Sequence, residues 1–160
     1  MEHPQITFIG AGNMASSIIG GLVESGQPAD RIHAADPFPQ SLERLREIAP
    51  VNTHDDNTAA VTGADVVILA VKPQVMADVC TGIAEAVQAS GALVISIAAG
   101  ITIASMRRWL GERTAIVRCM PNTPALLGCG ATGLYANEQR GTVFWFSLRK
   151  SRKSETSTII

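Results

Sequence analysis

Short apolar runs alternate with longer stretches in which apolar residues recur at helical spacing. The run at 66–71 is continuous and rich in β-branched residues, which is typical of a strand buried on both faces of a parallel sheet. The stretch after residue 12 instead repeats its apolar residues every three or four positions, which predicts an amphipathic helix. We expect strands at residues 6–9, 32–35, 66–71, 93–97 and 115–118, with a weaker one around Val51, and helices around 14–23, 42–48, 75–87 and 103–110.

This order of elements predicts the fold class. Strands and helices follow one another in alternation from residue 6 to residue 118. Each helix then connects two parallel strands, because it returns the chain to the edge of the sheet at which the previous strand began. The sequence therefore predicts an α/β protein with a doubly wound parallel sheet and helices on both faces.

The overall composition excludes several classes of protein. Thirteen Lys and Arg side chains against fourteen Asp and Glu give a net charge of -1, without the basic excess that binds nucleic acid or anionic lipid. The apolar runs are shorter than the roughly 18 to 20 residues of a membrane span, and residues 1–5 lack the features of a secretory signal. The three Cys and three His side chains lack the spacing of a metal site or a catalytic triad. We therefore expect a soluble, cytoplasmic protein with no metal, no membrane association and no nucleic-acid partner.

The last stretch of the chain, residues 140–160, departs from this pattern. It carries five basic side chains and one acidic side chain, whereas residues 1–139 carry eight basic and thirteen acidic ones. Basic, Ser-rich termini are usually solvated and unfolded, although such a segment can also contact phosphates or nucleic acid. We therefore expect one folded domain over residues 1–139 and an unfolded basic tail over residues 140–160.

The motif G-x-G-x-x-A spans Gly10 to Ala15, between the first predicted strand and the first predicted helix. In that position the first glycine makes a tight turn, the second leaves room for a pyrophosphate, and the alanine allows close helix packing. The N-terminus of the following helix offers backbone N–H groups and a positive dipole end to the phosphates. The alternative is a plain glycine-rich loop in a chain with fourteen glycines. The predicted phosphate-binding residues are Gly10, Ala11, Gly12, Asn13 and Met14.

Asp36 ends the second predicted strand, near the offset of roughly 20 residues at which an acidic side chain accepts hydrogen bonds from an adenosine ribose. This role favours NADH, because the carboxylate would repel the 2′-phosphate of NADPH. Arg44 and Arg46 lie too far into the next helix for us to expect them to bind that phosphate. A turn aspartate before Pro37 explains the residue equally well.

Further candidates follow the later strands, because ligands of open α/β sheets bind outside the carboxyl ends of the strands. Lys72 could hydrogen-bond a ribose hydroxyl or offset phosphate charge, and small residues at 98–100 would let a flat ring approach the backbone. Asn122 stands with Thr123 between two prolines, where it could bond a carboxamide or a substrate. A solvated loop lysine and two ordinary turns are the alternatives. The candidate residues here are Ala70, Val71, Lys72, Pro73, Ala98, Ala99, Gly100 and Asn122.

Taken together, these motifs resemble the pyrroline-5-carboxylate reductase family through about Gln139. The resemblance implies a Rossmann-type NAD(P)-binding domain that takes NADPH or NADH, and in it Asn57 matches a residue that contacts the adenosine half of the cofactor. The catalytic residues stay unassigned. The matching segments are FIGAGNMA at 8–15, AVKPQ at 70–74, SIAAGI at 96–101 and RCMPNTPA at 118–125, the last followed by glycines at 128, 130 and 133.

The resemblance also implies an activity. Family members transfer a hydride from nicotinamide to the carbon of the C=N bond of 1-pyrroline-5-carboxylate, which gives L-proline. They continue into a helical C-terminal domain that forms a homo-oligomer and completes the site for this small-molecule substrate. Residues 140–160 do not show the apolar periodicity of that domain, so we expect this chain to be the cofactor-binding part.

Two questions stay open at the level of the sequence. The first is the reaction, since a related imine reductase, a β-hydroxyacid dehydrogenase, or a cofactor-binding domain without turnover would share much of the pattern. The second is the cofactor, since the family commonly prefers NADPH whereas Asp36 favours NADH.

Overall fold

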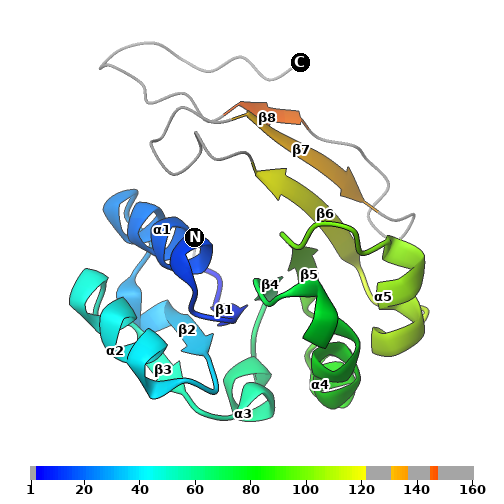
Figure 1. Ribbon diagram of the computed structural model, residues 1–160, viewed down its shortest axis with the longest axis horizontal. Helices are drawn as coiled ribbons and strands as arrows, with labels where there is room; N and C mark the ends of the chain where they lie inside the picture. The colour runs from blue at the N-terminus through cyan, green and yellow to red at the C-terminus, as the bar shows by residue number, and fades with distance from the viewer. Residues whose placement is uncertain (1–2, 122–130, 137–144, 148–160) are drawn as a thin grey trace.

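Figure 1 shows the protein as a computed structural model, which describes residues 3–121, 131–136 and 145–147. Within these residues one 8-stranded sheet has the strand order β3-β2-β1-β4-β5-β6-β7-β8. The pairings from β3 through to β6 are parallel, and β7 and β8 extend the sheet in antiparallel fashion. The strands are β1 (Ile6–Ile9), β2 (Ile32–Ala35), β3 (Asn52–His54), β4 (Val66–Leu69), β5 (Leu93–Ser96), β6 (Ile116–Pro121), β7 (Ala131–Ala136) and β8 (Trp145–Ser147).

Helices cover both faces of the parallel part of the sheet. On one face, Ile19 and Leu45 of the first two helices join a buried cluster with Phe8 of β1. On the other face, the remaining helices contribute residues such as Ile83 and Leu110 to a second buried cluster. The predicted doubly wound α/β fold is therefore confirmed. The helices are α1 (Asn13–Glu24), α2 (Pro39–Ile48), α3 (Asn57–Val61), α4 (Met76–Ser90) and α5 (Ile103–Leu110), with single 3-10 turns η1 (Ala29–Arg31) and η2 (Pro73–Val75).

The helix α4 shows why the apolar spacing predicts these elements. Its buried residues Met76, Cys80, Ile83 and Val87 recur every three or four positions and form one face of the helix. The helix ends at Gly91, which adopts the left-handed conformation with a φ of +66° that glycine tolerates without strain. The other face of α4 is left to polar and small residues, so the helix packs on the sheet in a single orientation.

The structure differs from the sequence prediction in several details. β4 ends at Leu69 rather than at residue 71, and β3 lies just after Val51 rather than around it. The short helix α3 and the antiparallel strands β7 and β8 were not among the predicted elements. Strand β8 falls within the predicted unfolded tail and pairs with β7. The other residues of the tail, and Asn122, lie outside the described residues.

No helix in the described part of the chain is long and apolar enough to cross a membrane.

Candidate functional site

The carboxyl ends of the parallel strands meet at one edge of the sheet. The ends of β1, β2 and β4 are in register, so that Ile9 lies opposite both Ala35 and Leu69. Leu69 in turn lies opposite Ser96 at the end of β5. The segments that follow these strands therefore begin at the same level of the sheet, as the strand-end argument predicts. The predicted residues that this edge brings together are Gly10, Ala11, Gly12, Asn13, Asp36, Ala70, Val71, Lys72, Pro73, Ala98, Ala99 and Gly100.

Gly10 lies where the ends of β1, β2 and β4 come closest together. Its backbone N–H donates a hydrogen bond to the carbonyl oxygen of Ala35 at 2.8 Å. Its φ is +99°, and a Cβ at this position would lie 2.6 Å from the carbonyl oxygen of Ala70. A side chain would therefore meet both backbone strain and a rigid neighbour, so the tight turn requires glycine.

Gly12 has the opposite surroundings, although it belongs to the same motif. It is exposed, and a Cβ built there would have no atom within 4 Å among the described residues. It is also the N-cap residue of α1, a helix that no side chain caps in the described part of the chain. Asp56 caps α3 and Thr102 caps α5, whereas α2 and α4 also have no side-chain cap among the described residues. Open space in front of an uncapped N-terminus of a twelve-residue helix fits an anionic phosphate group.

Asp36 makes two hydrogen bonds to the backbone at this edge. Its Oδ2 accepts from the N–H of Ala11 at 2.9 Å, and its Oδ1 accepts from the N–H of Phe38 at 2.9 Å. The second bond is the one that the turn interpretation predicts, while the first ties the end of β2 to the Gly-rich loop. A carboxylate has about four lone-pair sites, so acceptor capacity for a ribose hydroxyl remains.

The candidates after β4 and β5 are largely exposed at the same edge. Lys72 is exposed and immediately precedes η2, where Pro73 begins the turn. Ala98 is buried, and its N–H donates to Oγ of Ser96 at 3.3 Å, whereas Gly100 is exposed with a φ of +76°. Lys72 and Gly100 are therefore accessible to solvent at this edge. Ala70, Val71 and Met14 are half-buried, Ala99 is exposed, and Asn57 is the half-buried first residue of α3.

Two residues that we did not predict lie beside the Gly-rich loop. Ser41 and Arg44 of α2 line a cavity of about 270 Å³ together with Gly12 and Asn13. Arg44 was set aside at the level of the sequence because it lies in the second turn of that helix. Residues 41, 44 and 48 lie on one face of α2 by their spacing, but that spacing does not show that this face meets α1.

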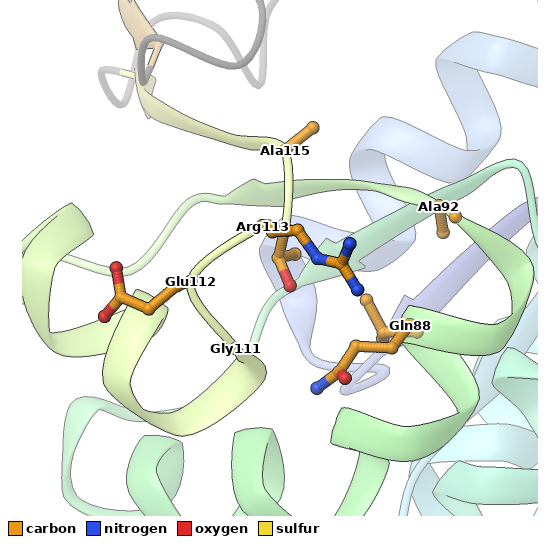
Figure 2. A pocket seen from close by; sticks show the side chains of 9 residues that line it. Gln88, Ala92, Gly111, Glu112, Arg113 and Ala115 are labelled. Atoms are coloured by element: carbon orange, nitrogen blue, oxygen red, sulfur yellow. The ribbon is translucent and has the colours of Figure 1, made fainter.

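A larger cavity, of about 310 Å³, lies at the opposite edge of the sheet (Figure 2). Ala92 and Ala115, which line it, precede β5 and β6, so it opens at the amino ends of these strands. There Nε2 of Gln88 donates to the carbonyl oxygen of Leu110 at 2.7 Å, and the side chain of Glu112 turns away from those of Gln88 and Arg113. None of the predicted site residues lines this cavity, and the amino ends of parallel strands are not where such sheets bind ligands.

The two cysteines in the described part of the chain, Cys80 and Cys119, are poor nucleophiles at neutral pH. Burial raises the pKa of the Cys80 thiol to about 12, so this side chain stays protonated at neutral pH. Burial also raises the pKa of Cys119. No group of three or more His, Cys, Asp or Glu side chains that could hold a metal ion occurs in the described ranges.

A pair of histidines joins β2 to β3 beside this edge. Nδ1 of His33 lies 2.9 Å from Nε2 of His54, and the two rings stack with their centroids 5.1 Å apart. This hydrogen bond needs one protonated ring nitrogen as donor and one unprotonated ring nitrogen as acceptor. It is therefore lost when both nitrogens of the contact carry a proton. Burial, the neighbouring His54 and the charge of Arg31 lower the pKa of His33 below its ordinary value of 6.5.

This pair predicts a pH dependence of stability. Because the folded state binds the His33 proton less readily than the unfolded state, the free energy of unfolding should fall as the pH drops below about 6.5. Urea unfolding between pH 7.5 and 5.0 would measure how the free energy of unfolding changes with pH. The contribution of His33 is the difference between the slope of the native protein and that of His33→Gln. Replacing the exposed His3 by Gln is the matched control and should keep the native slope. Identical slopes for His33→Gln and the native protein would contradict the prediction.

Comparisons with known proteins identify similar sequences and folds. The family model described as NADP oxidoreductase, coenzyme F420-dependent, matches residues 5–100. A pyrroline-5-carboxylate reductase from Pseudomonas aeruginosa is 51% identical over 139 residues, which make up 87% of this chain and 50% of that protein. The chain thus spans about half the length of the curated relatives that it matches. The resemblance noted from the motifs is confirmed.

Solved structures agree with these sequence matches. A pyrroline-5-carboxylate reductase from Coxiella burnetii superimposes with a TM-score of 0.83 at 42% identity, over 86% of this chain and 51% of that one. A pyrroline carboxylate reductase from Plasmodium falciparum, solved with NADP bound, gives a TM-score of 0.72 at 26% identity, over 86% of this chain and 50% of that one. The described fold is therefore that of about half of each of these two chains.

Proposed function

Because the chain belongs to the family of NADP oxidoreductases described as coenzyme F420-dependent, we propose that residues 1–139 form the NAD(P)H-binding part of a pyrroline-5-carboxylate reductase. The proposed reaction reduces the C=N bond of 1-pyrroline-5-carboxylate to L-proline. When bound, the reduced nicotinamide supplies the hydride that the imine carbon accepts. The work of this chain is then to bind and orient the two reacting molecules.

The observation that carries this proposal is the contrast between the two glycines of the motif. Gly10 is enclosed by backbone and makes the turn, while Gly12 faces open space in front of the uncapped α1. The backbone N–H groups of Gly12, Asn13 and Met14 would bind the pyrophosphate in this space, assisted by the positive end of the helix dipole. The fit follows from the shape and polarity of this position and is independent of the relatives' names.

The strand order supports a placement of the two halves of the cofactor on the two sides of β1. On the side of β2 and β3, Asp36 and Asn57 stand where the adenosine half would lie. On the side of β4 and β5, Lys72 and the segment 98–100 would contact the ribose and the nicotinamide ring, with Asn122 as a further contact. Hydride transfer needs the imine carbon held about 3 to 3.5 Å from the donor carbon, and the small residues at 98–100 leave room for that approach.

We further propose a small-molecule substrate without a nucleic-acid partner, a cytoplasmic location, and a homo-oligomer for the complete reductase. The net charge of -1 supports the proposal that there is no nucleic-acid partner, because nucleic-acid affinity rests on basic charge. The relatives named pyrroline-5-carboxylate reductase support the small-molecule substrate.

A chimera tests the proposed activity directly. We expect residues 1–139 of this chain, joined to the second half of the Pseudomonas aeruginosa relative, to form proline from 1-pyrroline-5-carboxylate with NADPH or NADH at about 1 per second or faster. The 51% identity over 139 residues makes this exchange conservative. The same chimera carrying Gly12→Val is the matched control and should be inactive. A folded chimera that binds cofactor but forms no proline would contradict the proposal.

A further inference from the structure

Arg44 is an arginine beside the Gly-rich loop whose guanidinium has no partner in the described part of the chain. It is exposed, it lines the cavity of about 270 Å³ with Gly12, Asn13 and Ser41, and it takes part in no hydrogen bond or ion pair there. Its neighbour Arg46 is also exposed, but Nε of Arg46 donates to Oγ1 of Thr53 at 3.0 Å. Two arginines one half-turn apart on α2 therefore face different surroundings, and only Arg44 faces the Gly-rich loop.

The position of α2 determines which part of a dinucleotide Arg44 can reach. Helix α2 follows β2, and β2 lies between β1 and β3, on the adenosine side of the proposed site (Figure 1). Helix side chains lean toward the N-terminus of their helix, so Arg44 extends toward the carboxyl edge of the sheet at which α2 begins. In the proposed site, the backbone N–H groups at the start of α1 already bind the pyrophosphate. The anionic group left for Arg44 is therefore one on the adenosine half.

NADPH and NADH differ in one such group, the 2′-phosphate on the adenosine ribose. A guanidinium presents several N–H donors in a planar fork that matches phosphate oxygens, and the hydroxyl of Ser41 can add a further hydrogen bond. We propose that Arg44, with Ser41, binds the 2′-phosphate of NADPH, so that this chain binds NADPH more tightly than NADH. The inference rests on the proposed cofactor-binding function and adds a specificity-determining residue to it.

The geometry of Asp36 agrees with this assignment. The argument for NADH required its carboxylate to face the ribose and repel a 2′-phosphate. In the structure its Oδ2 is bonded to the N–H of Ala11 and its Oδ1 to the N–H of Phe38, both at 2.9 Å. These bonds direct the carboxylate toward the loop backbone, and the two N–H donors offset part of its negative charge. The positive charge of Arg44, on the same side of Gly12, would attract a 2′-phosphate, whereas the charge of Asp36 would repel it.

The test compares the dissociation constants of NADPH and NADH for the native protein and three variants, measured by cofactor fluorescence. We expect Arg44→Gln to weaken NADPH binding by about tenfold to a hundredfold and to change NADH binding by less than about twofold. Arg44→Lys should recover part of the loss, since the charge remains. Arg46→Gln removes an equal charge from the same helix and is the matched control, with both cofactors bound as in the native protein.

Adenosine 2′,5′-bisphosphate and 5′-AMP, used as competitors of cofactor binding, differ only in the 2′-phosphate and carry no nicotinamide. Arg44→Gln should weaken the binding of the bisphosphate and leave the binding of 5′-AMP unchanged. Equal weakening of NADPH and NADH would place Arg44 at the pyrophosphate and overturn the inference while leaving the proposed function intact. Unchanged NADPH binding in Arg44→Gln would overturn it as well. A native protein that binds neither cofactor would overturn the proposed function together with the inference.

Discussion

Replacing Gly12 by valine is expected to abolish binding of both NADH and NADPH while leaving the fold nearly unchanged. The valine side chain would enter the open space in front of α1, which no described atom occupies and which a pyrophosphate would need. We expect the dissociation constants to rise by about a hundredfold or more, which corresponds to roughly 2.8 kcal/mol. Cofactor fluorescence measures the binding, and urea unfolding measures the stability of the same preparation.

Gly10→Ala provides the contrasting variant for this experiment. Its Cβ would lie 2.6 Å from the carbonyl oxygen of Ala70, and its φ of +99° disfavours any side chain. We therefore expect Gly10→Ala to lower the free energy of unfolding by about 1 to 3 kcal/mol or more, a loss that Gly12→Val should not show. Unchanged cofactor affinity in a folded Gly12→Val protein would show that phosphates do not bind at this helix.

The 160-residue chain assayed alone is expected to bind cofactor yet fail to reduce 1-pyrroline-5-carboxylate at an enzyme-like rate. Holding the imine carbon against the hydride donor can supply roughly 7 to 11 kcal/mol of barrier reduction. In the proposed function, the ends of β4 and β5 provide one wall for such a site. The relatives named pyrroline-5-carboxylate reductase are about twice as long as this chain.

Steady-state proline formation by the purified chain, with its mass confirmed, checks this expectation. Cofactor binding has to be measured on the same sample, because a misfolded protein would also be inactive. The active chimera described above is the positive control. Sustained turnover of the chain alone at about 1 per second or faster would show that these residues contain the whole catalytic site.

Much of the fold is predictable from the sequence because local pattern and topology agree. The buried run at 66–69 and the helical spacing of residues 76–87 each identify one element, and their alternation leaves few possible topologies. The antiparallel pairing of β6 with β7 is different, because it departs from the alternation of strand and helix on which the prediction rests. The five-residue α3 is too short to show a period, although Asp56 before it is a typical N-cap residue.

The candidate site also has one part that the sequence identifies and another part that it does not. The Gly-rich loop is identifiable because its chemistry depends on backbone geometry, which glycines at fixed spacing reveal. Arg44 was set aside because it lies too far into the helix that follows Asp36, whereas the packing of α2 against α1 brings it to the loop. The bond from the N–H of Ala11 to Asp36 was equally hidden, since sequence spacing does not show which way a carboxylate points, whereas the bond from the N–H of Phe38 fits the turn interpretation. Side-chain direction across packed helices is what the pattern of residue types leaves undetermined.

Strand β3 also affects how copies of this chain meet one another. It is the outermost strand on its side of the sheet, it contains three residues, and none of them is apolar. The side chain of Asn52 is already engaged, since its Nδ2 donates to the carbonyl oxygen of Asp30 at 2.8 Å. A foreign strand that approached this edge would find few backbone groups to pair with and no apolar side chains to bury. Aggregation by strand addition at β3 is therefore disfavoured, which protects the part of the sheet that holds Asp36.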